Sequence, residues 1–394
     1  MAADLADTRW KARAGLPLSK FCQTLFSSLP HSSQRRWGEI YVRGLLSVPD
    51  RKSIRRISDY VVGRRVDQCL QQFVNQSPWA WGPVRASLAH QVTTAIRPCA
   101  WVIDEVAFPK NGTHSVAVEK QYAPSIGRTL NCQLGLAVLL VTEAGSCPVN
   151  WRLMLPQCWA EDQQRRSRSY VPDTERCRSR WHYLIEALDE VSGQWGLPPP
   201  PVIVDGRGES SVELLLRALE TRGLRYLVQV SSEAKAVETS SGCFISAGEL
   251  ALAAARRART MVSWVDASTR RPIHAYVTLS PAHAVQSARV ELGYPHQRMR
   301  RVLGEWRARL SRPPALWLTN LTADNPAEVH SLSRSRERIW NDLSRMGEQS
   351  GLQHFEGRSF RGWHHHVTLA SAAHAYRLLC QLPEIQDPAY EQLC

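Results

Sequence analysis

The chain has 394 residues, 43% hydrophobic and 22% charged, which is typical of a soluble globular protein with two or three domains. No apolar run approaches the roughly 20 residues that cross a bilayer, and the N-terminal residues lack the layout of a secretory signal, so we expect a cytoplasmic protein that does not insert into membranes. The ten cysteines include no C-x-x-C pair, which argues against a zinc knuckle.

Basic residues exceed acidic ones, 49 against 36, giving a net charge of +13. This excess suits a polyanionic partner such as double-stranded DNA, although a GC-rich genome would also enrich arginine. A cluster of arginines between residues 256 and 312 favours a binding face. The arginines predicted to contact DNA are Arg256, Arg257, Arg300, Arg301, Arg358 and Arg361.

Residues 1–98 are predicted to form a helical domain. Apolar residues recur there at helical spacing, and Pro30, Pro49 and Pro78 break the pattern. The segment is also rich in arginine, so we expect a DNA-binding domain. The alternative is a helical domain with a solvated basic face.

From residue 99 the pattern changes to strands. Apolar runs predict strands at 100–104, 115–122, 132–142, 202–204 and 225–230, with helices at 181–195 and 211–221. This order favours a mixed α/β sheet of the ribonuclease H type, with its first part at 99–230. Residues 231–318 are predicted to form an inserted basic subdomain that contains strands. A helical part at 319–394 then completes the core.

Two aspartates end apolar runs about a hundred residues apart. Asp104 follows Trp101-Val-Ile, and Asp205 follows Val202-Ile-Val. Carboxylates at strand ends are suitable ligands for a divalent metal ion in phosphoryl transfer. Each aspartate alone could equally be a turn residue. Glu105 points to the opposite side of its strand, so we exclude it from the predicted site.

The first aspartate lies in a longer motif. The segment Asp104–Tyr122 resembles the first-aspartate motif of bacterial insertion-sequence transposases of the DDE class, and His354–His366 resembles a block near their C-terminal end. Between them, Asn131–Gly135 and Trp151–Pro156 follow in the same order. The resemblance implies a ribonuclease H-like core, an N-terminal helical DNA-binding domain, and cutting and joining of DNA ends with Mg²⁺ or Mn²⁺.

The third acid of this family departs from its pattern. The resemblance places Asp104 and Asp205 at the first two acids and Trp340 at the expected glutamate. Tryptophan offers only an N–H donor and cannot bind Mg²⁺. Glu337, three residues earlier, could replace the missing acid after a small rotation of the helix. Its alternative role is a solvated charge.

Three hypotheses follow. The protein is an active transposase that uses Asp104 and Asp205, a non-catalytic DNA-binding descendant, or an enzyme that reuses the cleft for another substrate with Trp340 as a wall. A homodimer is compatible with all three. The triplet His364–His366 cannot face a single metal, because successive helical residues diverge by about 100°. We expect these histidines to serve in capping, packing or phosphate contact.

Overall fold

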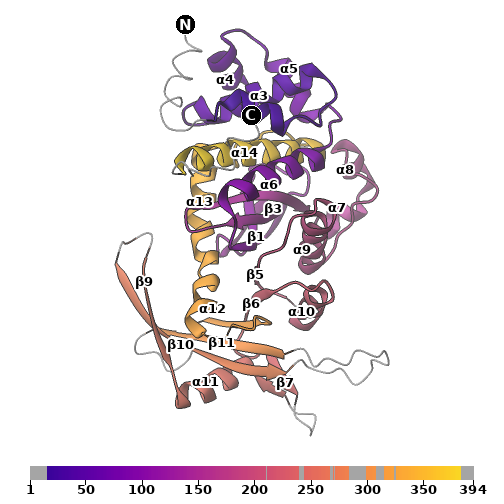
Figure 1. Cartoon of the computed structure of the whole chain (residues 1–394). Helices are drawn as coiled ribbons and strands as arrows, with labels where there is room; N and C mark the ends of the chain where they lie inside the picture. The colour runs from indigo at the N-terminus through magenta and orange to yellow at the C-terminus, as the bar shows by residue number, and fades with distance from the viewer. Residues whose placement is uncertain are drawn as a thin grey trace.

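The structure is a computed structural model that describes residues 16–209, 211–238, 244–266, 269, 271–283, 299–307, 315–323 and 325–382. An N-terminal group of helices lies on one side of the long C-terminal helix, and the sheets lie on the other side (Figure 1). Within the described residues, no helix has the length and apolar character needed to span a membrane.

The N-terminal part is helical, as predicted. Its elements are α2 (Leu18–Leu25), α3 (Ser32–Ser47), α4 (Ile54–Ile57), the π-helix η1 (Ser58–Val62), α5 (Asp67–Asn75) and α6 (Trp81–Ile96). Apolar side chains at helical spacing form the core of this part, with Phe21, Leu45, Leu70 and Leu88 buried among them. Trp79 is also buried in this part.

Five strands of the main sheet follow one another in the spatial order β4-β3-β1-β5-β6. Strand β3 pairs antiparallel with both β1 and β4, whereas β5 and β6 run parallel to β1. Their bounds are β1 (Ala100–Pro109), β3 (Arg128–Val141), β4 (Ser146–Met154), β5 (Val202–Asp205) and β6 (Tyr226–Val230). This arrangement confirms the predicted ribonuclease H-like core.

Further elements lie between these strands. They are β2 (Glu119–Ala123), α7 (Gln157–Glu161), α8 (Gln163–Arg168), α9 (Arg180–Leu188), the π-helix η2 (Asp189–Gln194) and α10 (Val212–Thr221). Strand β2 begins four residues later than predicted, because residues 115–118 form a turn in which Ala117 has a φ of 57°. Strand β4 is absent from the predicted strands, since Pro148, Asn150 and Arg152 interrupt its apolar pattern.

The sheet continues beyond β6 through the segment predicted as an insertion. Strand β12 (Ala315–Thr319) pairs antiparallel with β6, and β11 (Met299–Arg307), β10 (Pro272–His283) and β9 (Thr260–Val265) follow in order. A hairpin of β7 (Lys235–Glu238) and β8 (Phe244–Ser246) precedes α11 (Ala247–Arg257). Strands β9 to β12 of the segment therefore extend the core sheet, whereas β7 and β8 form a separate two-stranded sheet.

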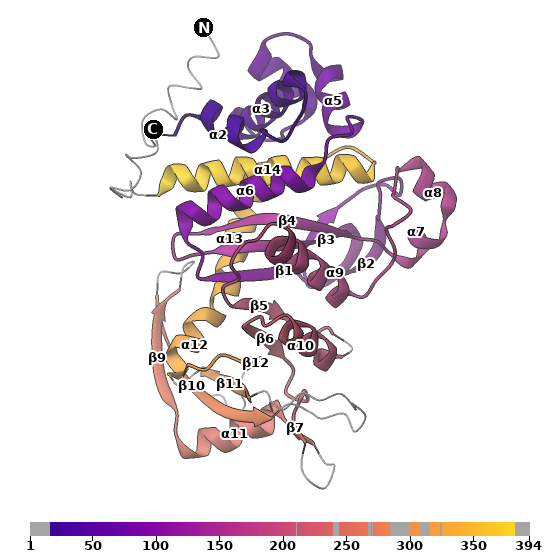
Figure 2. The same cartoon turned by 45° about the vertical axis from the view of Figure 1, so that its right-hand side comes forward.

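Three helices close the chain: α12 (Pro326–Ser333), α13 (Ser335–Gln349) and α14 (Phe360–Gln381). Helix α14 is buried over most of its length and lies beside α6, between the N-terminal helices and the sheet (Figures 1 and 2). Helix α13 contacts β1 and β5. Its position brings α13 side chains to the centre of the sheet.

The histidine triplet joins α14 to the N-terminal helices. His366 is 3.0 Å from the hydroxyl of Tyr41, and His364 is 3.0 Å from the guanidinium of Arg85. Both ring nitrogens of His365 contact backbone carbonyls of the N-terminal part, at 2.8 and 2.9 Å. Burial lowers the pKa of His365 to about 3. The triplet therefore serves in packing, one of its predicted roles.

Candidate active site with two aspartates and two arginines

The structure brings Asp104 and Asp205 together. Strands β1 and β5 are parallel neighbours in which Ile103 pairs with Val204, so the two aspartates occupy the next position along each strand. Their Oδ2 atoms contact the same nitrogen, Nη2 of Arg336, at 3.5 Å and 2.9 Å. Two carboxylates about a hundred residues apart in the sequence therefore share one cation.

A second arginine binds Asp205 from the turn that follows β5. The guanidinium of Arg207 donates from Nε to Oδ1 at 2.9 Å and from Nη2 to Oδ2 at 2.7 Å. The backbone N–H of Arg207 donates to the same Oδ1 at 3.0 Å. This bidentate geometry is the strongest that an arginine and a carboxylate can form. The carboxylate of Asp205 is therefore bound by two guanidinium groups.

The two aspartates differ in electrostatic environment. Burial raises the pKa of Asp104, although the charge of Arg336 and the N–H of Glu105 oppose the rise. Burial also acts to raise the pKa of Asp205, but the hydrogen bonds from Arg207 and the charge of Arg336 outweigh it and hold that pKa below its usual value. Asp205 is therefore the more stable anion of the pair.

The position expected to carry the third acid lies one helical turn beyond Arg336. The ring of Trp340 is 5.8 Å from the Arg336 guanidinium, so residues 336 and 340 share one face of α13. Glu337 projects from another face. It contacts Arg334 at 3.1 Å and Arg307 at 3.8 Å, and its side chain is 53% exposed. Glu337 is thus paired with arginines and makes no contact with either aspartate.

The opposite face of β1 carries a separate charge cluster. Glu105 and Glu209 both form ion pairs with Arg180, which begins α9. Arg180 also donates to the backbone carbonyl of Asp205 at 2.9 Å. Glu105 therefore faces away from Asp104, as strand alternation predicts. The roles of Arg180 and Arg336 were not predicted from the sequence. For Arg336, the available signal was its four-residue spacing from Trp340.

The aspartate pair can be tested for fit to a divalent ion. Carboxylate oxygens are the ligands that Mg²⁺ and Mn²⁺ prefer, and Asp104 and Asp205 converge on the point that Nη2 of Arg336 contacts. Among the described residues, no group of three histidine, cysteine, aspartate or glutamate side chains has the arrangement of a metal site. The residues therefore fit one ion held by two carboxylates, without a third protein carboxylate.

The family model for DDE superfamily endonucleases matches residues 24–244. The chain belongs to the DDE superfamily of endonucleases. The match includes both aspartates and ends before α13, the helix that carries Arg336 and Trp340. No curated protein matches the chain.

Membership of the DDE superfamily implies DNA as the substrate. An arginine that contacts DNA must be exposed and free to meet a phosphate, so the exposure and partners of each predicted arginine matter. Arg256 and Arg257 are exposed at the C-terminal end of α11. Arg301 on β11 is half-buried and donates to the carbonyl of Ala323 at 2.6 Å. The cluster also includes Arg270, Arg298, Arg309 and Arg312, which lie outside the described residues.

Arg300 requires a correction. Its side chain is buried, and its guanidinium is bound by Glu213 and Glu220 of α10. A buried guanidinium with two carboxylate partners is not presented to a DNA phosphate. The sequence does not reveal this. Side chains of β11 alternate between the two faces of the sheet, but only the structure shows that α10 provides the carboxylates on the face that carries Arg300.

Of the remaining two predicted arginines, Arg358 precedes α14 and Arg361 lies in its first turn, and Figure 1 shows α14 far from α11. Arg358 is exposed. Arg361 is half-buried and donates to the backbone carbonyl of Gln76 at 3.0 Å. The arginines predicted to contact DNA therefore lie in two separate regions, at α11 and at α14.

Proposed function

We propose that this DDE superfamily endonuclease binds double-stranded DNA and cleaves and joins its strands, with Asp104 and Asp205 holding one Mg²⁺ or Mn²⁺ ion. The observation that carries the proposal is the convergence of both carboxylates, from adjacent parallel strands, on a single cationic nitrogen. A point at which a buried and a half-buried carboxylate meet is suited to a divalent ion.

A bound divalent ion supplies Lewis-acid polarisation of a phosphoryl oxygen. The chain itself supplies orientation and charge. Rigid neighbouring strands hold Asp104 and Asp205 in place, and Gln229 accepts a hydrogen bond from Arg336 at 3.0 Å, which orients its guanidinium. Arg336 and Arg207 lie where they can offset the negative charge of a DNA phosphate.

We propose that this activity is slow. Trp340 occupies the α13 position at which a third carboxylate would lie beside the pair, and Glu337 is engaged by Arg334 and Arg307. Without a third ligand, the second ion of a two-metal site has no protein carboxylate of its own. Loss of that ion lowers the rate of phosphoryl transfer and leaves DNA binding intact.

The second candidate function is DNA binding without cleavage. It is favoured by the two arginines, since Arg336 and Arg207 already neutralise both carboxylates. In that case the aspartate pair would hold α13 against the sheet, and the basic surfaces would carry the function. The predicted homodimer is compatible with both functions and stays a prediction.

A nicking assay separates the two functions. Purified protein is incubated with supercoiled plasmid carrying the DNA that flanks its own gene, with Mg²⁺, Mn²⁺ or EDTA. We expect nicking with either metal and none in EDTA. Asp104→Asn should abolish nicking, by a factor above about 10³, while fluorescence anisotropy shows unchanged DNA binding. Binding without nicking under every metal condition would leave the second function.

A further inference from the structure

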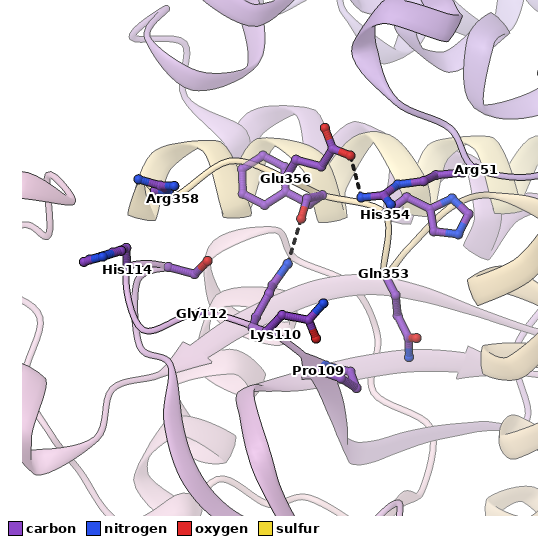
Figure 3. Close-up of a pocket in the computed structure, with 12 residues that line it drawn as sticks. Arg51, Pro109, Lys110, Gly112, His114, Gln353, His354, Glu356 and Arg358 are labelled. Atoms are coloured by element: carbon purple, nitrogen blue, oxygen red, sulfur yellow. Dashed lines mark hydrogen bonds and ion pairs between the residues drawn. The ribbon is translucent and has the colours of Figure 1, made fainter.

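A cavity of about 540 Å³ lies apart from the aspartate pair, at the C-terminal end of β1. Three segments of the chain form it: the connection from α3 to α4, the turn after β1, and the loop before α14 (Figure 3). Its charged and titratable lining residues are Arg51, Lys110, His114, His354, Glu356 and Arg358. This volume is large enough for a group the size of a nucleotide.

Lys110 is a half-buried cation in the lining of this cavity. Its Nζ donates to the backbone carbonyl of Phe355 at 2.7 Å and lies 5.9 Å from the centre of the Phe355 ring. Burial lowers the pKa of Lys110, and the nearby charge of Glu356 partly opposes this effect. A carbonyl orients the ammonium group but leaves its charge uncompensated.

The single carboxylate in the lining is already engaged. Glu356 accepts a hydrogen bond from Arg51 at 2.6 Å, and Figure 3 shows this pair at the upper edge of the cavity. Arg358 and His114 lie on the left of the view, whereas Arg51 lies on the right (Figure 3). Within the described residues, no carboxylate forms an ion pair with Lys110 or Arg358. The lining therefore carries three permanent positive charges and one negative charge.

We propose that this cavity binds a phosphate group of the DNA backbone, at a position separate from the aspartate pair. The identity of the ligand as DNA rests on the proposed function. Lys110 follows Asp104 by six residues, which corresponds to about 20 Å along an extended strand. That separation is the length of roughly six base pairs at about 3.4 Å each. One duplex can therefore reach both sites.

The cations that line the cavity come from three parts of the chain. Arg51 belongs to the connection from α3 to α4, Lys110 to the turn after β1 and Arg358 to the segment that leads into α14. A phosphate in this cavity would therefore lie where the N-terminal helical part, the core and the C-terminal segment meet.

Salt-dependent DNA binding tests this proposal. Every protein carries Asp104→Asn and is assayed in EDTA, so that cleavage competence has no influence on the result. Fluorescence anisotropy measures the dissociation constant of a duplex of roughly 30 base pairs, long enough to span both sites, over a series of KCl concentrations. The variants are Lys110→Gln, Arg358→Gln and Lys110→Arg. Arg225→Gln is the matched control, because Arg225 is exposed and precedes β6, whereas Lys110 follows β1, so the two residues lie at opposite ends of the parallel strands.

We expect Lys110→Gln and Arg358→Gln each to weaken duplex binding about tenfold and to reduce the slope of log K against log salt by about one. Lys110→Arg should retain most of the affinity because it keeps the charge, and Arg225→Gln should match the parent protein. The proposal is overturned if both cavity variants bind with the parent affinity and slope while thermal unfolding shows them folded. If no protein, the parent included, binds duplex DNA, the proposed function itself fails.

A free phosphate is the other source of the same chemistry. Thermal unfolding is therefore measured with increasing inorganic phosphate for the parent protein and Lys110→Gln. Stabilisation of the parent alone, together with unchanged duplex binding by the cavity variants, would assign the cavity to a small phosphate ligand and overturn the assignment to DNA. Loss of duplex affinity in the cavity variants supports the DNA assignment.

Discussion

Two clusters, one around Arg300 and one around Arg336, each join the main sheet to a helix through an arginine and two carboxylates. They differ in how many of the arginine nitrogens have a hydrogen-bond partner. In the first, all three nitrogens of Arg300 donate to Glu213 or Glu220, at distances from 2.6 to 3.2 Å. In the second, Arg336 contacts Asp104, Asp205 and Gln229, but its buried Nε has no hydrogen-bond partner. The first cluster is saturated and the second is not.

This difference distinguishes a structural ion cluster from one that can change partners. A buried charge is tolerated when every donor and acceptor is satisfied, and the Arg300 cluster meets that condition with 1% exposure of the arginine. The aspartate cluster is less complete, and Arg207 at its edge has a side chain that is 49% exposed. Partners that are incompletely bound can be displaced by a metal ion or a phosphate.

The largest effect on stability is expected at the saturated cluster. Arg300→Met removes the guanidinium that binds Glu213 and the buried Glu220, which should lower the free energy of unfolding by about 3–5 kcal/mol. Urea denaturation measures this change. Arg225→Met, at an exposed arginine, is the control and should have little effect. A loss below about 1 kcal/mol in Arg300→Met would contradict the structural role of this cluster.

The next effect is expected at the incomplete cluster. Trp340→Glu places a carboxylate on the face of α13 that carries Arg336, beside the aspartate pair. We expect Mn²⁺-dependent nicking to increase, by roughly 10- to 100-fold, because a third ligand becomes available. The companion variant Glu337→Gln should leave nicking unchanged. If Glu337→Gln instead abolishes nicking, Glu337 itself is the third ligand.

A smaller effect is expected from the exposed arginine of the same cluster. Arg207→Met removes a bidentate partner of Asp205, but solvent screens this pair and Arg336 remains beside the carboxylate. The free energy of unfolding should therefore fall by less than about 1 kcal/mol. Urea denaturation beside Arg300→Met gives the comparison directly. Equal losses in the two variants would show that the two clusters do not differ as proposed.

The smallest effect is a difference in pH dependence between the two aspartates. The pKa of Asp205 is lowered, so its contribution to stability is present above the ordinary value of 3.8 and is lost as the pH falls through the folded pKa. The pKa of Asp104 is raised, so the stability it contributes is present below 3.8 and is lost as the pH rises through the folded pKa.

Urea denaturation across the acidic and neutral range tests this opposition. Relative to wild type, Asp104→Asn should gain stability as the pH rises, because the variant has no carboxylate to ionise in a buried site. Asp205→Asn should lose stability relative to wild type over the same range. Two variants that change in the same direction with pH would exclude the proposed difference between the aspartates.

The sequence predicted the core of this fold well because its signals are local. Apolar runs located β1, β3, β5 and β6, and helical spacing located the N-terminal helices. Strand β4 was missed, since Pro148 and Asn150 break its apolar pattern and only pairing with β3 makes it a strand. Strand β12 was placed in an insertion, whereas it pairs with β6 and extends the core sheet.

For the site, the sequence by itself determined which residue types are available: two aspartates at the ends of apolar runs, a tryptophan where a third acid is expected, and many arginines. Only the tertiary structure decided which of these meet. It placed Arg336 between the aspartates, turned Glu337 toward Arg307 and Arg334, and buried Arg300 against α10. The physical reason is that a charge takes its role from the partners and solvent around it, and those come from segments distant in the chain.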